Sequence, residues 1–275
     1  MGTPEARPPG HRMSFDAAAD TYRRGRPPYP DAVFELLAAR CGLRPGTRVL
    51  DIGAGTGLAT GPLLAAGAHV VAVEPGEHLA AILTAELACD RLEVVIGEFE
   101  TADLGAAGAG GFDLAVAATS LHWLDPVVST RRLGELVRPG GRVAAWWTEF
   151  GDTRRPTPFR DRLDEVYHDL LPAEPGYRDS RPRALDTDRW RRQLTAGGWF
   201  GEVAVDVVEW HQTLTPRTAR DLWSTFPNIA ELAPPAREEF LTRLAALVED
   251  QGGRVEDPRL TVLHTTTRTT TRTTV

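Results

Sequence analysis

Lysine is absent from this sequence of 275 residues, and all 31 basic residues are arginine. A lysine Schiff base with a carbonyl compound therefore cannot form, which excludes the usual pyridoxal-phosphate enzymes. The lysine that a phosphate-binding P-loop directs at its nucleotide is missing as well. The absence of lysine therefore excludes both the pyridoxal-phosphate enzymes and the P-loop nucleotide-binding proteins.

Cysteine is scarce, because Cys41 and Cys89 are the only two in the chain. They form neither a CxxC pair nor a zinc spacing, and they are too few for a disulfide scaffold. We expect both thiols to be reduced and to act as small packing residues rather than as nucleophiles. No HExxH or paired ligand spacing occurs among the histidines, so no metal site is predicted.

Long apolar runs and an excess of positive charge are also lacking. No apolar run approaches about 18 residues, the length that a membrane-spanning helix needs. The proline-rich N-terminus has no apolar centre of the kind found in secretory signals. A formal net charge of −7 argues against a general nucleic-acid or anionic-membrane surface. We expect a cytoplasmic protein with no nucleic-acid or membrane partner.

Short apolar segments alternate with helical patterns along most of the chain. Strands separated by about 10–15 residues of helical pattern imply βαβ units, a parallel sheet and helices on both faces. The predicted fold class is α/β, a Rossmann-like doubly wound sheet that is mostly parallel and has seven strands. The predicted strands are Arg48–Ile52, Val70–Val73, Glu93–Ile96, Phe112–Ala118, Arg142–Trp147, Glu202–Trp210 and Leu260–Thr267.

The most specific motif is VLDIGAGTGLAT, which occupies residues 49–60. An apolar strand ends near Asp51 and runs into Gly53, Gly55 and Gly57 before a helix begins. Glycine is needed where the backbone turns with positive φ and a ligand lies close against it. Amide groups at the start of the following helix favour polar ligand groups.

The spacing of this loop separates it from the dinucleotide fingerprint G-x-G-x-x-G, whose last position is Leu58 here. A carboxylate at Asp51 would gain little from a pyrophosphate, but it would stabilise a ligand that carries an ammonium and a sulfonium. Glu74 ends the second strand, 21 residues after Gly53, where an acid accepts hydrogen bonds from ribose hydroxyls. That acid suits NAD and S-adenosylmethionine alike, so it indicates a nucleoside without naming it.

These motifs resemble the class I S-adenosylmethionine-dependent methyltransferases. The matching segments are VLDIGAGTG, Glu74, IGEFE at the end of the third strand, and FDLAVAATSLHW in the fourth. FDAAADTYRRGRPPYP, TFPNIAEL, the His-Trp pair and the Trp-Trp pair resemble a small-molecule subgroup that includes trans-aconitate methyltransferases. The resemblance covers roughly residues 14–268. It implies methyl transfer from S-adenosylmethionine to a small-molecule acceptor, with O-methylation of a carboxylate or hydroxyl favoured over N- or C-methylation.

The resemblance also implies cofactor contacts, residue by residue. Asp51, Gly53 and Gly55 would line the methionine portion, and Ala118 and Thr119 would meet its amino-acid end. Glu74 would hold the ribose, Pro75 would lie beside the adenine, and Glu98 and Phe99 would contact its edge and face. Tyr22 and Arg26 would fold over the cofactor, and Arg26 would pair with the cofactor carboxylate. Arg23 and Arg24 compete for that last role.

The acceptor side rests on His122, which follows the fourth strand. It is the best candidate for a general base, and the alternative is a histidine that shapes the pocket beside Trp123. Trp146 and Trp147 lie on opposite faces of their strand, so at most one of them need face the site, and core packing is expected of each taken singly. The candidate substrate-binding residues are Tyr29, Trp123, Trp146, Trp147 and Trp223.

The predicted organisation has four parts: a disordered leader (1–12), an N-terminal lid and helix (13–44), a cofactor-binding Rossmann-like core (45–150), and the remainder of the sheet with helical cap insertions after strands 5 and 6 (151–275). One cap helix is expected over 218–250, broken at Pro234-Pro235. Two other functions stay open: a non-methylating S-adenosylmethionine-binding protein or cyclase on this fold, and an NAD-dependent oxidoreductase. Calorimetry with both cofactors and turnover to S-adenosylhomocysteine separate them.

Overall fold

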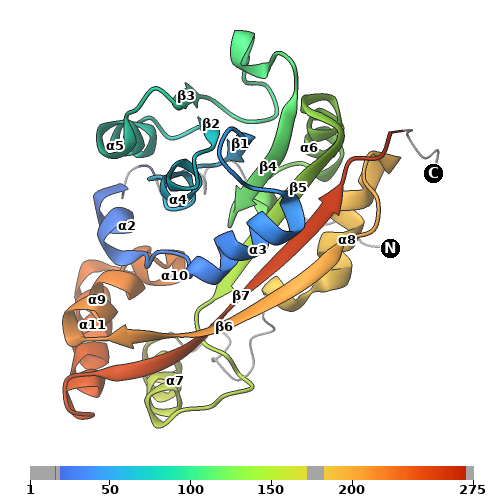
Figure 1. Ribbon diagram of the computed structural model, residues 1–275. Helices are drawn as coiled ribbons and strands as arrows, with labels where there is room; N and C mark the ends of the chain where they lie inside the picture. Colours follow the sequence, from blue (N-terminus) through green and yellow to red (C-terminus); the bar gives the residue numbers. More distant parts are fainter. Residues whose placement is uncertain (1–15, 17–18, 172–182, 271–275) are drawn as a thin grey trace.

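Seven strands form one sheet in the order β3-β2-β1-β4-β5-β7-β6 (Figure 1). The computed structural model describes residues 16, 19–171 and 183–270, so the predicted leader lies outside the described residues. Strands β1 to β5 are parallel, whereas β7 runs antiparallel to both β5 and β6. The predicted fold class is therefore confirmed. The strands are β1 (Arg48–Ile52), β2 (His69–Glu74), β3 (Leu92–Ile96), β4 (Phe112–Ala118), β5 (Val137–Glu149), β6 (Ala204–Leu214) and β7 (Val255–Thr267).

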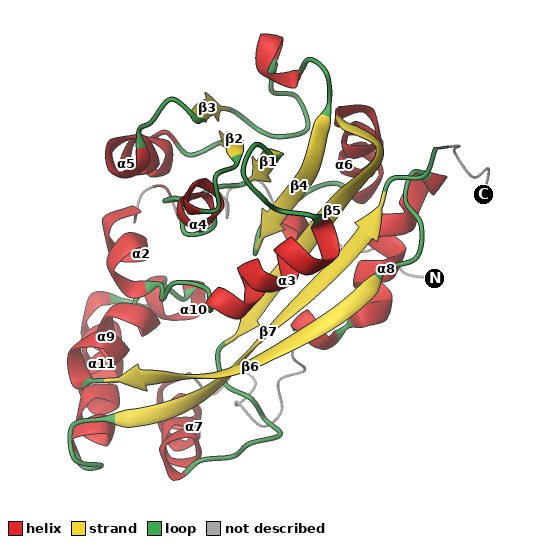
Figure 2. Ribbon diagram, viewed as in Figure 1, coloured by secondary structure: helices red, strands yellow, loops and turns green. Residues whose placement is uncertain are grey.

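Helices cover both faces of this sheet (Figure 2). One face carries α3 (Asp31–Cys41), α4 (Thr60–Ala65) and α5 (Glu77–Leu87), and the other carries α6 (Pro126–Leu136) and α8 (Thr187–Thr195). Side chains alternate accordingly, since Val70 and Leu114 pack with the first group and Val71 and Ala115 with the second. Burial on both faces explains why these strands read as continuous apolar runs.

A cap lies beyond the carboxyl end of β5, built from α7 (Pro158–Leu170), α9 (Pro216–Trp223), α10 (Pro227–Ala230) and α11 (Pro234–Glu249). It has an apolar core of its own, which includes Phe159, Trp223 and Phe240. The helix α2 (Ala19–Gly25) packs against both α9 and α5, so the N-terminal segment joins the cap to the Rossmann-like core. The helix α8, expected to belong to the cap, packs on the sheet instead.

The prediction of one continuous helix from residue 218 to Pro234 is wrong. Helix α9 ends at Trp223, and the short helix α10 lies between it and α11. Pro227 has no N–H to continue a helix from α9, and it occupies the first turn of α10 instead. A capping box between Thr215 and Thr218 starts α9 two residues earlier than predicted. The cap is therefore made of shorter helices around the core that they share.

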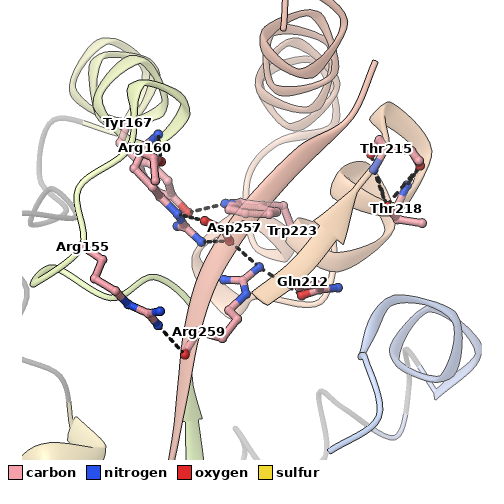
Figure 3. Close-up of polar contacts among 10 residues, drawn as sticks. Arg155, Arg160, Tyr167, Gln212, Thr215, Thr218, Trp223, Asp257 and Arg259 are labelled. Atoms are coloured by element: carbon pink, nitrogen blue, oxygen red, sulfur yellow. Dashed lines mark hydrogen bonds and ion pairs between the residues drawn. The ribbon is translucent and has the colours of Figure 1, made fainter. Parts of the chain in front are cut away.

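The last strand begins at Val255, five residues before the predicted start at Leu260. The charged residues Asp257 and Arg259 made this part of the strand resemble a loop in the sequence. Both are buried in an ion cluster (Figure 3). The carboxylate of Asp257 accepts a hydrogen bond from Nε of Arg160 at 2.6 Å and pairs with Nη2 of Arg259 at 2.7 Å. Burial raises the pKa of Asp257, but the two guanidinium groups outweigh it and hold that pKa below its usual value. The cluster fastens α7 of the cap to β7.

Candidate active site

A cavity of about 250 Å³ opens at the carboxyl ends of β1, β2 and β4. Tyr22 and Arg26 from the N-terminal segment and Pro227 from the cap complete its wall. Ligands of open α/β sheets bind at this edge. Ten of the eleven residues expected to contact a cofactor line this one cavity: Tyr22, Arg26, Gly53, Gly55, Glu74, Pro75, Glu98, Phe99, Ala118 and Thr119. Asp51 is fully buried and does not line it.

The glycine loop uses its first two glycines in different ways. Gly53 has a φ of 66°, and a Cβ there would lie 2.6 Å from Cβ of Ser120. Gly55 has a φ of 59°, and a Cβ there would meet no heavy atom within 4 Å. Because Gly55 lines the cavity, the space beside it belongs to the site. Gly53 thus permits close packing of two strand ends, and Gly55 leaves room for a ligand.

Glu74 links the glycine loop after β1 to the turn after β2 by hydrogen bonds. Its Oε2 accepts a hydrogen bond from the backbone N–H of Gly55 at 2.8 Å, and its Oε1 accepts one from Gly76 at 2.9 Å. Burial raises the pKa of Glu74, and these two hydrogen bonds only partly oppose that shift. A carboxylate can accept about four hydrogen bonds, so Glu74 retains the capacity to accept from ligand hydroxyls.

Asp51 lies behind the glycine loop with one oxygen satisfied and one not. Its Oδ2 accepts a hydrogen bond from the Thr60 hydroxyl at 2.7 Å, whereas its buried Oδ1 has no hydrogen-bond partner among the described residues. Burial raises the pKa of Asp51 to about 7, the Thr60 bond opposes the shift, and the charge of Glu74 adds to it. A buried acid in this state is suited to a cationic ligand group.

The end of β4 is strained and closely held. Thr119 has a φ of 58°, the only positive φ at a non-glycine residue within the described part of the chain. Its hydroxyl is 3.0 Å from that of Tyr29, and the neighbouring Ser120 donates a hydrogen bond to the carbonyl of Ile52. Strain of this kind costs about 1–3 kcal/mol and gathers at functional sites. Ser120 also lines the cavity and was not predicted, although a polar residue after β4 was a usable signal.

Of the three competing arginines, only Arg26 lines the cavity. Its guanidinium lies 4.9 Å from the ring centres of both Phe150 and Phe226, and its buried Nε has no hydrogen-bond partner among the described residues. Arg23 pairs with Glu86 at the surface, and Arg24 is exposed. Burial lowers the pKa of Arg26, and no described carboxylate compensates its charge. An anionic ligand group would complement this cation.

His122 and Trp123 also line the cavity, as expected of an acceptor site. Tyr29 lines an adjoining cavity of about 20 Å³, which shares Tyr22, Arg26 and Thr119 with the main one. The other three candidate tryptophans line neither cavity. Trp146 and Trp223 are buried in apolar clusters, and Trp147 packs in the core behind His122.

Two further properties bound what the site can do. Within the described ranges, no three side chains of histidine, cysteine, aspartate or glutamate gather in a way that could hold a metal ion. None of the helices in those ranges has both the length and the apolar character required to cross a bilayer. The polar groups that line the cavity are those of Glu74, Arg26 and the glycine loop, and the carboxyl group of Asp51 is buried outside the lining.

Comparison with known proteins identifies the family to which the chain belongs. The family model of a methyltransferase domain matches residues 50–143, which contain the glycine loop and Glu74. Uncharacterized methyltransferases of Mycobacterium tuberculosis and Mycobacterium bovis are 34% identical over 237 residues, which is 86% of this chain and 86% of theirs.

Two solved structures share the fold. A protein of Anaeromyxobacter dehalogenans assigned as a type II methyltransferase is 24% identical, with a TM-score of 0.57 over 88% of this chain and 96% of its own. Phosphoethanolamine N-methyltransferase 2 of Haemonchus contortus, solved with S-adenosyl-L-methionine, is 15% identical, with a TM-score of 0.53 over 94% of this chain and 60% of its own. The chain belongs to the class I S-adenosylmethionine-dependent methyltransferases. It is an enzyme of that family, and S-adenosylmethionine is its cofactor.

The raised pKa of Asp51 predicts that cofactor binding depends on pH. Because its pKa is raised to about 7, the ligand-free fold holds an extra proton, and this group's contribution to stability falls as the pH rises from about 4 to 7. A cationic ligand favours the carboxylate, so we expect binding to release a proton in that range. We expect the Kd for S-adenosylmethionine to rise by up to about tenfold for each pH unit below 7. Titration calorimetry in buffers of different ionisation enthalpy measures both effects.

Asp51→Asn is the control for this pH dependence, since it keeps the shape of the side chain and cannot ionise. The variant should bind more weakly at pH 8 and lose most of the slope below pH 7. Glu74, whose pKa is also raised, would be the source of any slope that the variant retains. An unchanged slope in Asp51→Asn would contradict the assignment.

Asp16 anchors the N-terminal segment beside the site. The helix α5 has no side-chain cap of its own, and Oδ1 of Asp16 accepts hydrogen bonds from the backbone N–H groups of His78 and Leu79. We expect Asp16→Ala to raise the Kd for S-adenosylmethionine by about 5- to 20-fold, because loss of a cap costs about 1–2 kcal/mol and frees the segment that carries Arg26. His78→Ala removes only an exposed ring contact and should have a smaller effect. Equal effects in both variants would disprove the capping role.

Proposed function

We propose that this enzyme transfers the methyl group of S-adenosylmethionine to an oxygen of a small-molecule acceptor, a carboxylate or a hydroxyl. The observation that carries the proposal is the enclosure of the site. The N-terminal segment supplies Tyr22 and Arg26, the cap supplies Pro227, and both lie over the carboxyl ends of the central strands. A wall assembled from both sides admits a small acceptor more readily than a base or side chain carried on a macromolecule.

The cofactor roles that we propose follow the charges around the cavity. When bound, S-adenosylmethionine supplies a methyl group that is already activated by its sulfonium. Arg26 pairs with the cofactor carboxylate, and Asp51 stabilises the cationic part of the methionine end. Glu74 accepts from the ribose hydroxyls, while Pro75 and Phe99 hold the adenine. Alignment of acceptor and methyl group is then the main task of the protein, and it lowers such barriers by about 7–11 kcal/mol at most.

The acceptor is proposed to lie at the Thr119 end of the cavity, between His122 and the adjoining small cavity. Thr148, Phe150 and Trp210 line that second cavity together with Tyr29. The similarity of the N-terminal and C-terminal segments to trans-aconitate methyltransferases supports a small polar acceptor at this place.

Transfer of a radiolabelled methyl group tests this proposal. The purified enzyme is incubated with methyl-labelled S-adenosylmethionine and separate pools of small carboxylic acids, small alcohols and phenols, RNA, and protein. We expect label in a small product, together with S-adenosylhomocysteine. Label that stays in RNA or protein would overturn the small-molecule assignment. Release of volatile methanol by mild base marks a methyl ester, and a base-stable product marks an ether.

A further inference from the structure

A hydrogen bond behind the acceptor site fixes the chemical state of His122. The indole Nε1 of Trp147 donates to Nδ1 of His122 at 3.1 Å. An indole N–H is a donor only, so Nδ1 of His122 must be the acceptor in this pair. A neutral imidazole carries one proton, which then resides on Nε2. Since Nδ1 points at Trp147, Nε2 is the second polar atom of a ring that lines the cavity.

We infer that His122 presents an N–H donor to the acceptor oxygen rather than acting as a general base, and that Trp147 is the positioning residue that sets this tautomer. The inference rests on the proposed function and assigns a role within that same site. A ring nitrogen that already carries a proton has no lone pair with which to remove another. Protonation at Nδ1 would set two donors against each other and break the bond to Trp147.

Trp147 is held firmly enough to fix the tautomer. It is 3% exposed, and its ring stacks on that of Trp190 with centres 3.8 Å apart and an interplanar angle of 19°. The ring of His264 lies against it at 5.7 Å in an edge arrangement. Trp190 belongs to α8, which is packed on the sheet, so the indole cannot rotate without disturbing a buried layer.

Glu74, Tyr29 and Asp51 do not replace His122 as a base. Both oxygens of Glu74 accept backbone hydrogen bonds at the ribose side of the site. The Tyr29 hydroxyl is paired with that of Thr119, and burial raises the pKa of Tyr29 well above its usual value, so the phenol stays neutral. Asp51 lies behind the glycine loop and does not line the cavity.

The reaction balances without a base when the acceptor is a carboxylate. A carboxylate oxygen forms the new bond to the methyl carbon, the bond between that carbon and sulfur breaks, and its electron pair stays on sulfur. No proton is released, because a carboxylate is already ionised at neutral pH. The Nε2–H of His122 holds the carboxylate in line by hydrogen bonding, preferably to the oxygen that does not react. A hydroxyl acceptor would instead release a proton that neither His122 nor Tyr29 is set to receive.

The test is the tautomer of His122, measured by long-range ¹H–¹⁵N NMR of the full-length enzyme saturated with S-adenosylhomocysteine. We expect Nδ1 to be unprotonated and Nε2 protonated, with the resonance assigned by its absence in His122→Gln. In Trp147→Phe, which keeps a stacked ring but has no donor, the two nitrogen shifts should move toward each other as the tautomers exchange. Protonated Nδ1 in the wild type, or identical spectra in Trp147→Phe, would overturn the inference.

Kinetics with the acceptor found by the labelling screen supply the second readout, at saturating cofactor. Trp147→Phe should raise the acceptor KM by about 3- to 10-fold with an unchanged Kd for S-adenosylhomocysteine. His122→Gln, whose amide nitrogen replaces Nε2, should retain more kcat than His122→Asn, whose shorter amide replaces Nδ1. A wild-type kcat that falls as the pH drops through the usual histidine range would favour a general base and contradict the inference. The NMR measurement requires no turnover, so failure to find an acceptor would count against the proposed function alone.

Discussion

Gly55→Val should bind S-adenosylmethionine at least about 100-fold more weakly than the wild type, a loss of about 2.8 kcal/mol. Gly55 lines the cavity, and a Cβ there meets no protein atom within 4 Å. We therefore expect the added side chain to occupy part of the cavity in place of the ligand. The N–H of Gly55 also donates to Glu74, and displacement of this backbone would disturb the ribose side as well. Calorimetry and a thermal-shift assay with S-adenosylhomocysteine measure the loss.

Backbone strain must be separated from occupation of the site, and Gly42→Val is the matched control. Gly42 has a φ of 71°, similar to the 59° of Gly55, and its Cβ would also meet nothing within 4 Å. It ends α3 at an exposed position and does not line the main cavity. Both variants should lose about 1–2 kcal/mol of stability from the left-handed conformation. Only Gly55→Val should lose the cofactor, and parallel losses in both would show that strain alone is responsible.

The part of the cavity at the ends of β1 and β2 was predictable from the sequence because its determinants are local. The glycine loop follows β1 directly, and Glu74 ends the next strand in the chain, so spacing alone brings them to neighbouring strand ends. Parallel strands buried on both faces also give continuous apolar runs, which made the core strands easy to recognise. Periodicity and turn chemistry act over a few residues, and these features need nothing more.

The features that were missed depend on contacts between distant parts of the chain. Asp16 caps a helix 62 residues away, and Ser120 bonds to a carbonyl 68 residues away. The donor that fixes His122 comes from Trp147, on the next strand of the sheet. The start of β7 resembled a loop because Asp257 and Arg259 are charged, and only their burial with Arg160 reveals a strand. Local pattern cannot show which charges find a buried partner.

Arg26→Met should raise the Kd for S-adenosylmethionine by about 10- to 100-fold, because a hydrogen bond to a charged group contributes about 1.5–3 kcal/mol. Methionine keeps an apolar chain against Phe150 and Phe226, whose ring centres each lie 4.9 Å from the guanidinium, so the substitution removes the charge while it preserves most of the packing. Arg24→Met is the control, since Arg24 is exposed on helix α2, two residues before Arg26, and its substitution should have no measurable effect on binding.

The partner of Arg26 is identified by a ligand that lacks the carboxylate. 5′-Methylthioadenosine keeps the adenine, ribose and sulfur but has no amino-acid end, so Arg26→Met should bind it about as well as the wild type does. Titration of S-adenosylhomocysteine and 5′-methylthioadenosine, both of them thioethers, into both proteins gives the coupling energy between the guanidinium and the amino-acid end of the ligand. An equal loss for the two ligands would mean that Arg26 acts by holding the N-terminal segment closed. If Arg26→Met binds S-adenosylmethionine as tightly as the wild type does, Arg26 does not bind the cofactor, and its charge would serve the acceptor instead.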